Sequence, residues 1–260
     1  MTIEGAVRTL SVVQTLKDAG FYQEGEPEDL KSQFVEQDQI NLGGKTYSRS
    51  KFSRYDIKVF ADQLENKIEQ LDPLIQAVYA KNAVLLLSVI RIVNNESKQG
   101  FKGSAGSGNE LDFIQLAARS FYDPDPSATA RSKWSRPITS TGSKWFIEGL
   151  TSGANLIMGE EEALIVLAMY NPATNPCVDA VQVTKNSDSK NLDDLDFVII
   201  NDEKGSPLIE LKIPLILPPE ETGKIQAYYF QTGTDEMQPI GLWIVQAKNL
   251  RDLTDIATLA

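Results

Sequence analysis

Apolar residues recur at steps of three and four through much of the first half of the chain, which is the spacing of one helix face. The stripe from Ile57 to Leu71 predicts a long amphipathic helix with Ser53 as its N-cap. Asp72 and Pro73 are residue types favoured at the start of a helix, so a second helix is expected to follow directly. The predicted helices span residues 3–19, 53–71, 72–93 and 110–120.

Short apolar segments separated by turn residues indicate strands, above all in the second half of the chain. Asn41–Lys45 predicts a hairpin turn between Phe34-Val35 and Thr46-Tyr47. From Trp145 onward, turn signals such as Asn171-Pro172 separate runs that are mostly strand-like. The predicted strands span residues 145–150, 163–170, 180–184, 197–200, 208–213, 224–232 and 240–247. Short strands with regular turns are typical of an antiparallel β-sandwich.

Together these patterns predict an α+β protein with a helical N-terminal region followed by an antiparallel, jelly-roll-like β-sandwich. We expect the helical region to span residues 1–125 and the sandwich to span residues 145–260. Residues 126–144 are basic, polar and rich in Ser and Thr, which predicts a connector or extended arm. The pattern leaves open whether the helices pack on the sandwich or form a separate lobe.

The composition removes several classes of chemistry. The 260 residues include no histidine and one cysteine, so a Ser-His-Asp triad, a Cys-His pair and a His- or Cys-based zinc site are excluded. The net charge of −11 disfavours a protein that coats nucleic acid wholesale. The most apolar window, residues 83–90, is too short to span a bilayer, and the N-terminus does not resemble a signal peptide. We therefore expect a cytoplasmic protein that is not an enzyme and has no cofactor.

Acidic residues gather in the C-terminal half, where clustered carboxylates could hold Ca²⁺ or Mg²⁺. The clusters are Glu160–Glu162, the group Asp193, Asp194 and Asp196, and Asp202-Glu203. No EF-hand spacing is present, and acidic loops at the ends of a sandwich are usually solvated. We predict no metal site here, although an Asp/Glu enzyme with a divalent metal remains an alternative.

A basic segment stands out in this acidic chain, because residues 127–147 contain no Asp or Glu. Its Arg and Lys side chains could neutralise phosphates, and its Trp rings could stack on bases. Trp and Arg are also favoured anchors of protein interfaces, so we prefer a subunit contact over a nucleic-acid contact. The candidate contact residues are Arg131, Lys133, Trp134, Arg136, Lys144 and Trp145.

Three phrases follow one another in the C-terminal region. Leu167–Pro172 gives a strand that ends in an Asn-Pro turn. Ile213–Pro219 gives a Leu-x-Leu-Pro stretch, and Gly223–Phe230 a Tyr/Phe-rich strand. In this order the phrases resemble a phage-associated family of virion structural proteins. The resemblance covers about the last 100 residues, contains no catalytic motif, and implies a coat or capsid subunit built on a jelly-roll-like sandwich.

Our leading hypothesis is a homo-oligomeric structural protein of a virion, assembled in the host cytoplasm. Its partners would be further copies of itself, with packaged nucleic acid on the basic segment as an additional partner. The first alternative is a β-sandwich module that binds carbohydrate or another protein. The second is the divalent-metal enzyme described above.

Overall fold

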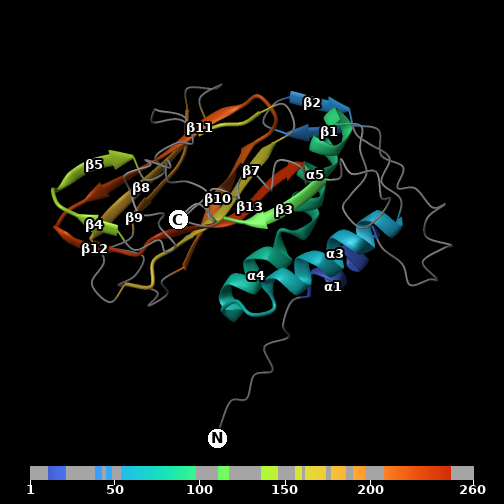
Figure 1. Cartoon of the computed structure of the whole chain (residues 1–260), viewed down its shortest axis with the longest axis horizontal. Helices are drawn as coiled ribbons and strands as arrows, with labels where there is room; N and C mark the ends of the chain where they lie inside the picture. The colour runs from blue at the N-terminus through green and yellow to red at the C-terminus, as the bar shows by residue number, and fades with distance from the viewer. Residues whose placement is uncertain are drawn as a thin grey trace, which may run out of the picture.

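The computed structural model of the chain describes most of the expected elements (Figure 1). The described residues are 11–21, 39–42, 45–48, 54–97, 111–116, 136–145, 156–159, 162–173, 177–185, 190–196 and 208–246. The helices are α1 (Val12–Asp18), α3 (Arg54–Ile68), α4 (Pro73–Lys81) and α5 (Ala83–Ser97). The strands are β1 (Gln39–Leu42), β2 (Lys45–Ser48), β3 (Leu111–Gln115), β4 (Arg136–Ile138), β5 (Gly142–Trp145), β6 (Leu156–Ile157), β7 (Ala163–Tyr170), β8 (Val178–Lys185), β9 (Lys190–Asp196), β10 (Leu208–Leu217), β11 (Thr222–Tyr229), β12 (Gly233–Asp235) and β13 (Gln238–Gln246). The chain is therefore a mixed α+β protein with antiparallel sheets.

The helix signals of the sequence are confirmed in the described part of the N-terminal region. Ser11 caps α1 by accepting a hydrogen bond from the Gln14 amide, and Gly20 after the helix has a positive φ of 77°. Asp72 caps α4 in the same way, through a 2.8 Å bond from the Leu74 amide. The predicted second helix is broken at Asn82, where α4 and the start of α5 meet at 58°.

The four-stranded sheet has the strand order β10-β7-β13-β3 and is buried on both faces. One face packs against the helices, which lie together on one side of it in Figure 1. Ile165, Leu242 and Ile244 belong to this face. The opposite face carries Leu164 and Trp243 into a second core. The helices thus share a core with the β-sheet, which answers the question left open by the sequence.

The five-stranded sheet encloses the second core from the other side. Its order is β5-β11-β8-β9, with β6 also paired to β11. Alternate residues of β11 enter the core, such as Ile225 and Ala227. Neither sheet is closed: β10 and β3 end the first, and β5 and β9 end the second. The end strands β9 and β10 lie side by side, so the two sheets approach each other there.

A fully buried tyrosine joins the helices to the sheet. The Tyr79 hydroxyl of α4 donates to the Gly241 carbonyl at 2.7 Å and accepts from the Gly241 amide at 3.2 Å. Gly241 lies where the register between β13 and β7 shifts, and its carbonyl also accepts a 3.3 Å hydrogen bond from the Leu116 amide. A Cβ at Gly241 would lie 1.8 Å from the Ile165 carbonyl oxygen, so only glycine fits.

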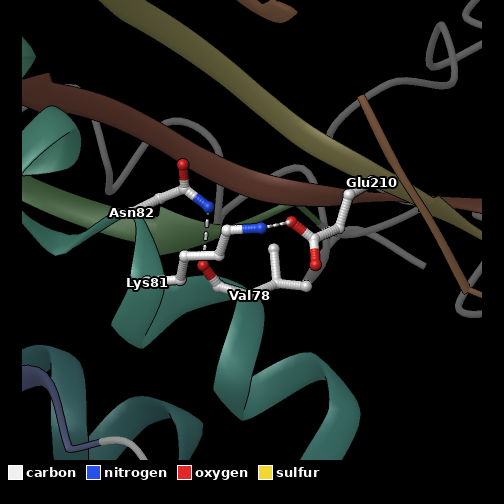
Figure 2. A network of polar contacts seen from close by, with 4 residues as sticks. All are labelled: Val78, Lys81, Asn82 and Glu210. Carbon is white, nitrogen blue, oxygen red and sulfur yellow. Dashed lines mark hydrogen bonds and ion pairs between the residues drawn. The ribbon is translucent and has the colours of Figure 1, made fainter. Parts of the chain in front are cut away.

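A second link between α4 and the sheet lies at the surface (Figure 2). Lys81 near the end of α4 forms a 2.6 Å ion pair with Glu210 of β10. The neighbouring Asn82 side chain donates a hydrogen bond to the Val78 carbonyl at 2.8 Å. This bond gives a partner to a carbonyl in the last turn of α4. Because both charged side chains are largely exposed, this ion pair adds little stability.

Three sequence predictions need correction. Residues 111–115 form strand β3 instead of a helix, because this segment pairs along its whole length with β13 and buries Phe113 against Phe60. Part of the predicted connector is also strand: β4 pairs with β12, and β5 pairs with β11. The Asp-rich residues expected just before a strand instead form strand β9, paired with β8. The predicted strand 197–200 lies outside the described residues.

The strands predicted at residues 163–170, 180–184, 208–213, 224–232 and 240–247 overlap described strands. Of the predicted strand 145–150 only Trp145 is described, as the last residue of β5. β7 spans the predicted residues 163–170, and the turn after it is held by the Ala173 amide, which donates to the Asn171 side chain at 3.2 Å. β1 and β2 pair with Gly43 and Gly44 between them, although the first strand starts at Gln39. The expected strand segment Phe34-Val35 lies outside the described residues.

Within the described residues, no single helix is long and apolar enough to cross a membrane. Helix α4 and the start of α5 reach that length only as a bent pair.

Candidate functional site

The predicted contact residues fall into two groups. Arg131, Lys133 and Trp134 lie outside the described residues. The others lie on short strands: Arg136 begins β4, and Lys144 and Trp145 end β5. The described part of the basic segment, residues 136–145, therefore consists mainly of two short strands, and each strand pairs with one described neighbour.

Strand β5 ends the five-stranded sheet and is paired only with β11 among the described strands. Lys144 is opposite Ala227, and Trp145 is opposite Gln226. Ala227 belongs to the core face, whereas Gln226 lies on the outer face. Because neighbouring residues of a strand alternate between faces, Lys144 and Trp145 occupy positions on opposite faces of the sheet.

Arg136 is separated from both of these residues by its own ladder. Arg136 is opposite Asp235 in the register of β4 with β12. Asp235 is completely buried. The Tyr229 hydroxyl donates to Asp235 at 3.4 Å, and the Cys177 thiol lies 3.8 Å from the Thr234 carbonyl. Burial raises the pKa of the Cys177 thiol, and the negative charge of Asp235 raises it further. Cys177 is therefore a protonated, buried thiol and a poor nucleophile.

A second group of charges, which the sequence did not reveal, lies where β8 ends and β11 begins. Lys185 and Glu221 form an ion pair at 3.4 Å, and each side chain is only 6% exposed. The Met158 amide donates to the Glu221 carbonyl at 3.0 Å, which ties this turn to the segment after β6. The two charged residues are far apart in the sequence, so no local motif indicated their pairing.

Glu162 is the described member of the acidic run at 160–162. Its carboxylate accepts a 3.3 Å hydrogen bond from the Gly159 amide. Burial raises the pKa of this carboxyl, and the bond from the Gly159 backbone opposes that shift. The Gly159 carbonyl also accepts from the Glu220 amide at 3.3 Å, so Glu162 and the turn at Glu220 are fixed through the same glycine.

The acidic residues of β9 do not gather into one cluster. Asp193 is opposite Val183 on the core side, whereas Asp194 is opposite Gln182 on the outer side. Across the described part of the chain, no group of three or more His, Cys, Asp or Glu residues is arranged to hold a metal ion. Glu160, Glu161, Asp202 and Glu203 lie outside the described residues.

A groove of about 630 Å³ lies among the helices and was also not predicted from the sequence. Its lining is largely polar and acidic, with Asp62, Glu65 and Glu69 from α3 and Gln76 from α4. The Ser11 hydroxyl donates to Glu65, and the Gln76 amide donates to the carbonyls of Glu69 and Leu71. These bonds hold the helices together across the groove and account for several of its polar groups.

Comparison with known proteins adds little to this geometry. No protein-family profile matches the chain, and no curated protein sequence matches it. One solved structure found as similar is the Drosophila NLP core, whose crystal structure is described as providing insight into pentamer formation and histone binding. The match is 9% identical, covers 52% of this chain and 94% of that one, and has a TM-score of 0.20. A likeness at this TM-score supports no argument about fold or function.

Proposed function

We propose that this chain is a self-assembling structural subunit of a virion coat or capsid, and that it performs no catalysis. The observation that supports the proposal is the position of β5, since the described end of the predicted contact segment is an end strand of a sheet. An end strand offers a row of backbone N–H and C=O groups with which another chain can pair. A segment chosen from its residue types as a subunit contact thus has a backbone suited to that role.

The proposal includes a finer description of the fold. Two antiparallel sheets around one core are consistent with the sandwich architecture of many coat proteins, of which the jelly roll is one form. In this view the helices on the outer face of the β7–β13 sheet are an addition to the sandwich. The virion and the host cytoplasm, where assembly would take place, belong to the same proposal.

Assembly of the purified chain is the direct test. Sizing chromatography with light scattering, followed by negative-stain microscopy, is expected to reveal shells, rings or filaments. A monomeric mass at high protein concentration and in varied salt would contradict the proposal. The same measurement after nuclease treatment separates the two partners: assembly that survives treatment needs only the protein, whereas assembly lost on treatment depends on nucleic acid.

A matched pair of variants tests the role of β5. Trp145→Ala removes the predicted aromatic anchor and is expected to weaken each subunit contact by about 2 kcal/mol or more. Leu74→Ala is the control, because Leu74 is a large apolar residue that is 50% exposed and lies on α4, away from β5. Circular dichroism of both variants checks that they remain folded. Equal assembly by the two variants would mean that Trp145 is not a contact residue.

A further inference from the structure

Asn171 has a buried side-chain nitrogen for which the described residues supply no acceptor. The residue is 2% exposed, and its Nδ2 atom donates no hydrogen bond to any described group. Its Oδ1 atom accepts a 3.2 Å bond from the Ala173 amide, so the oxygen of the side chain is paired and the nitrogen is not. Buried polar groups are normally paired, and an exception at a buried position points to a functional role.

The next residue, Pro172, removes the usual self-reaction of an asparagine. In that reaction the following backbone nitrogen attacks the side-chain carbonyl, and the asparagine deamidates. A proline nitrogen carries no hydrogen, so it cannot close this ring. The opposite attack stays open to Asn171, in which Nδ2 attacks the carbonyl carbon of its own residue. That attack breaks the peptide bond to Pro172.

The turn around Asn171 favours this attack. A carboxamide attacks through its nitrogen most readily after losing a proton, when the negative charge lies largely on its oxygen. The Ala173 amide donates to that oxygen, and a donor stabilises the charged form of the group it contacts. Tyr170, at the end of β7, is paired with both β10 and β13, so the chain leading into Asn171 is held in place. Pro172 is exposed, so water can solvate the departing nitrogen.

We propose that the chain cleaves its own backbone between Asn171 and Pro172. Nδ2 forms a bond to the carbonyl carbon of Asn171 and gives up a proton. The bond from that carbon to the Pro172 nitrogen breaks, and the nitrogen keeps the electron pair and takes up the proton. The products are residues 1–171, which end in a succinimide ring, and residues 172–260, which begin with the free amine of Pro172. The step consumes no water and no oxidant.

The cut would open the connection between the two sheets without removing a strand from either. β7 ends at Tyr170, and β8 begins at Val178. β7 pairs with β10 and β13, which belong to the other fragment, so the two fragments would stay associated in the folded protein. The step occurs once in each chain and needs no substrate, so it goes beyond the proposed function and does not depend on assembly.

Mass spectrometry of the full chain tests the cleavage. The purified protein is kept folded at mildly alkaline pH with protease inhibitors, and samples are denatured for analysis. Fragments of residues 1–171 and 172–260 are expected, and at early times their masses should sum to the mass of the intact chain. A protease would instead add one water to that sum. Asn171→Ala is expected to abolish the cut.

The chain contains its own matched control. Asn175-Pro176 is the same dipeptide in the same connection, so Asn175→Ala is expected to leave the cleavage at Asn171 unchanged. Unfolding the wild-type chain in guanidinium chloride at the same pH is expected to slow that cleavage about tenfold or more, because the orientation of Nδ2 is lost. This comparison needs no variant, so it decides the matter even if Asn171→Ala fails to fold.

Three outcomes would overturn the proposal. A folded wild-type chain that stays intact would mean that Nδ2 is only an unpaired group in the core. Equal cleavage after Asn171 and after Asn175, or equal rates in the folded and the unfolded chain, would mean that the dipeptide alone accounts for the reaction. Because the fragments are measured after denaturation, none of these results depends on whether the chain assembles.

Discussion

At the scale of single residues, one phenol group links a helix to the sheet through two hydrogen bonds. Tyr79 is fully buried, and its hydroxyl both donates to and accepts from the backbone of Gly241. Tyr79→Phe would leave the Gly241 amide buried without this partner, so we expect it to lower the free energy of unfolding by about 1–3 kcal/mol. Tyr228→Phe is the control, since that hydroxyl makes a long 3.4 Å bond to Gln182 on the half-buried outer face. Urea titrations with equal m-values measure both changes; similar losses in the two variants would contradict the prediction.

The same residue gives the protein a specific sensitivity to alkali. Burial raises the pKa of Tyr79 above its ordinary value near 10, while the bond to Gly241 opposes this only in part. Above pH ~10 the unfolded chain loses this proton and the folded chain keeps it, so stability falls as pH rises. Below that pH the contribution is fully present. We expect the stability difference between wild type and Tyr79→Phe to shrink above pH ~10. A difference that stays constant up to pH ~11 would mean that the hydroxyl is accessible to solvent.

Lys185 and Glu221 form a buried ion pair, and we expect the stability of the fold to depend on keeping both charges together. Removing one partner leaves an isolated buried charge, so Lys185→Met or Glu221→Gln is expected to cost about 3–5 kcal/mol. Replacing both with apolar residues of similar size is expected to recover most of this loss, because no unpaired charge remains. A double-mutant cycle from denaturant unfolding measures the coupling. Additive losses in the double variant would indicate that each residue acts through other contacts.

At the scale of elements, the register shift between β13 and β7 depends on Gly241. A Cβ there would collide with the Ile165 carbonyl oxygen, which belongs to the backbone and cannot move aside alone. We expect Gly241→Ala to separate the two strands and to prevent accumulation of soluble, folded protein. Gly159→Ala is the control, since a Cβ at Gly159 meets only the Glu162 side chain at an ordinary 3.6 Å. Soluble yield and circular dichroism measure the result, and a stable Gly241→Ala protein would mean that the strands are not this close.

Elements in which the apolar residues recur at one clear spacing were predictable from the sequence. Elements without such a spacing were not. The apolar stripe of α3 and the long apolar run of β7 each fit one kind of element, and both lie where the sequence places them. Residues 111–115 are too short to show a period, and their strand form depends on pairing with the distant β13. β9 contains three aspartates, which are uncommon in strands, and it is stabilised by its ladder with β8.

The candidate site was predictable only in part, for the same physical reason. Residue types identified Lys144 and Trp145 as contact residues, but only the register with β11 places them on opposite faces of an end strand. The register with β8 likewise separates Asp193 from Asp194, which the sequence had grouped in one acidic cluster. Lys185 is the last residue of β8 and Glu221 precedes β11, so the two are far apart in the sequence and give no local signal of the ion pair that the folded sheet creates.

At the scale of the whole molecule, the helices, the four-stranded sheet and the five-stranded sheet stack in that order (Figure 1). The four-stranded sheet is buried on both faces, so its outer side depends on segments from the first half of the chain. Phe60 of α3 and Phe113 of β3 contact each other edge to face at 5.5 Å within this helix–sheet core. A fragment that begins at the sandwich would therefore lack both strand β3 of this sheet and the helices that cover its outer face.

This dependence predicts that residues 145–260 will not fold alone, although the sequence marks them as a separate region. Without the helices, Ile165, Leu242 and Ile244 would form an exposed apolar face, and β13 would lose its partner β3. We expect the fragment to aggregate or to bind a hydrophobic dye, and the full chain to unfold in one transition that near-UV and far-UV circular dichroism report together. A soluble, cooperatively folding fragment, or two separate transitions in the full chain, would show that the helices and the sandwich are independent domains. Co-expression of residues 1–125 with the fragment is the control, because restored solubility would show that the missing helix–sheet core, and not the cut itself, caused the loss.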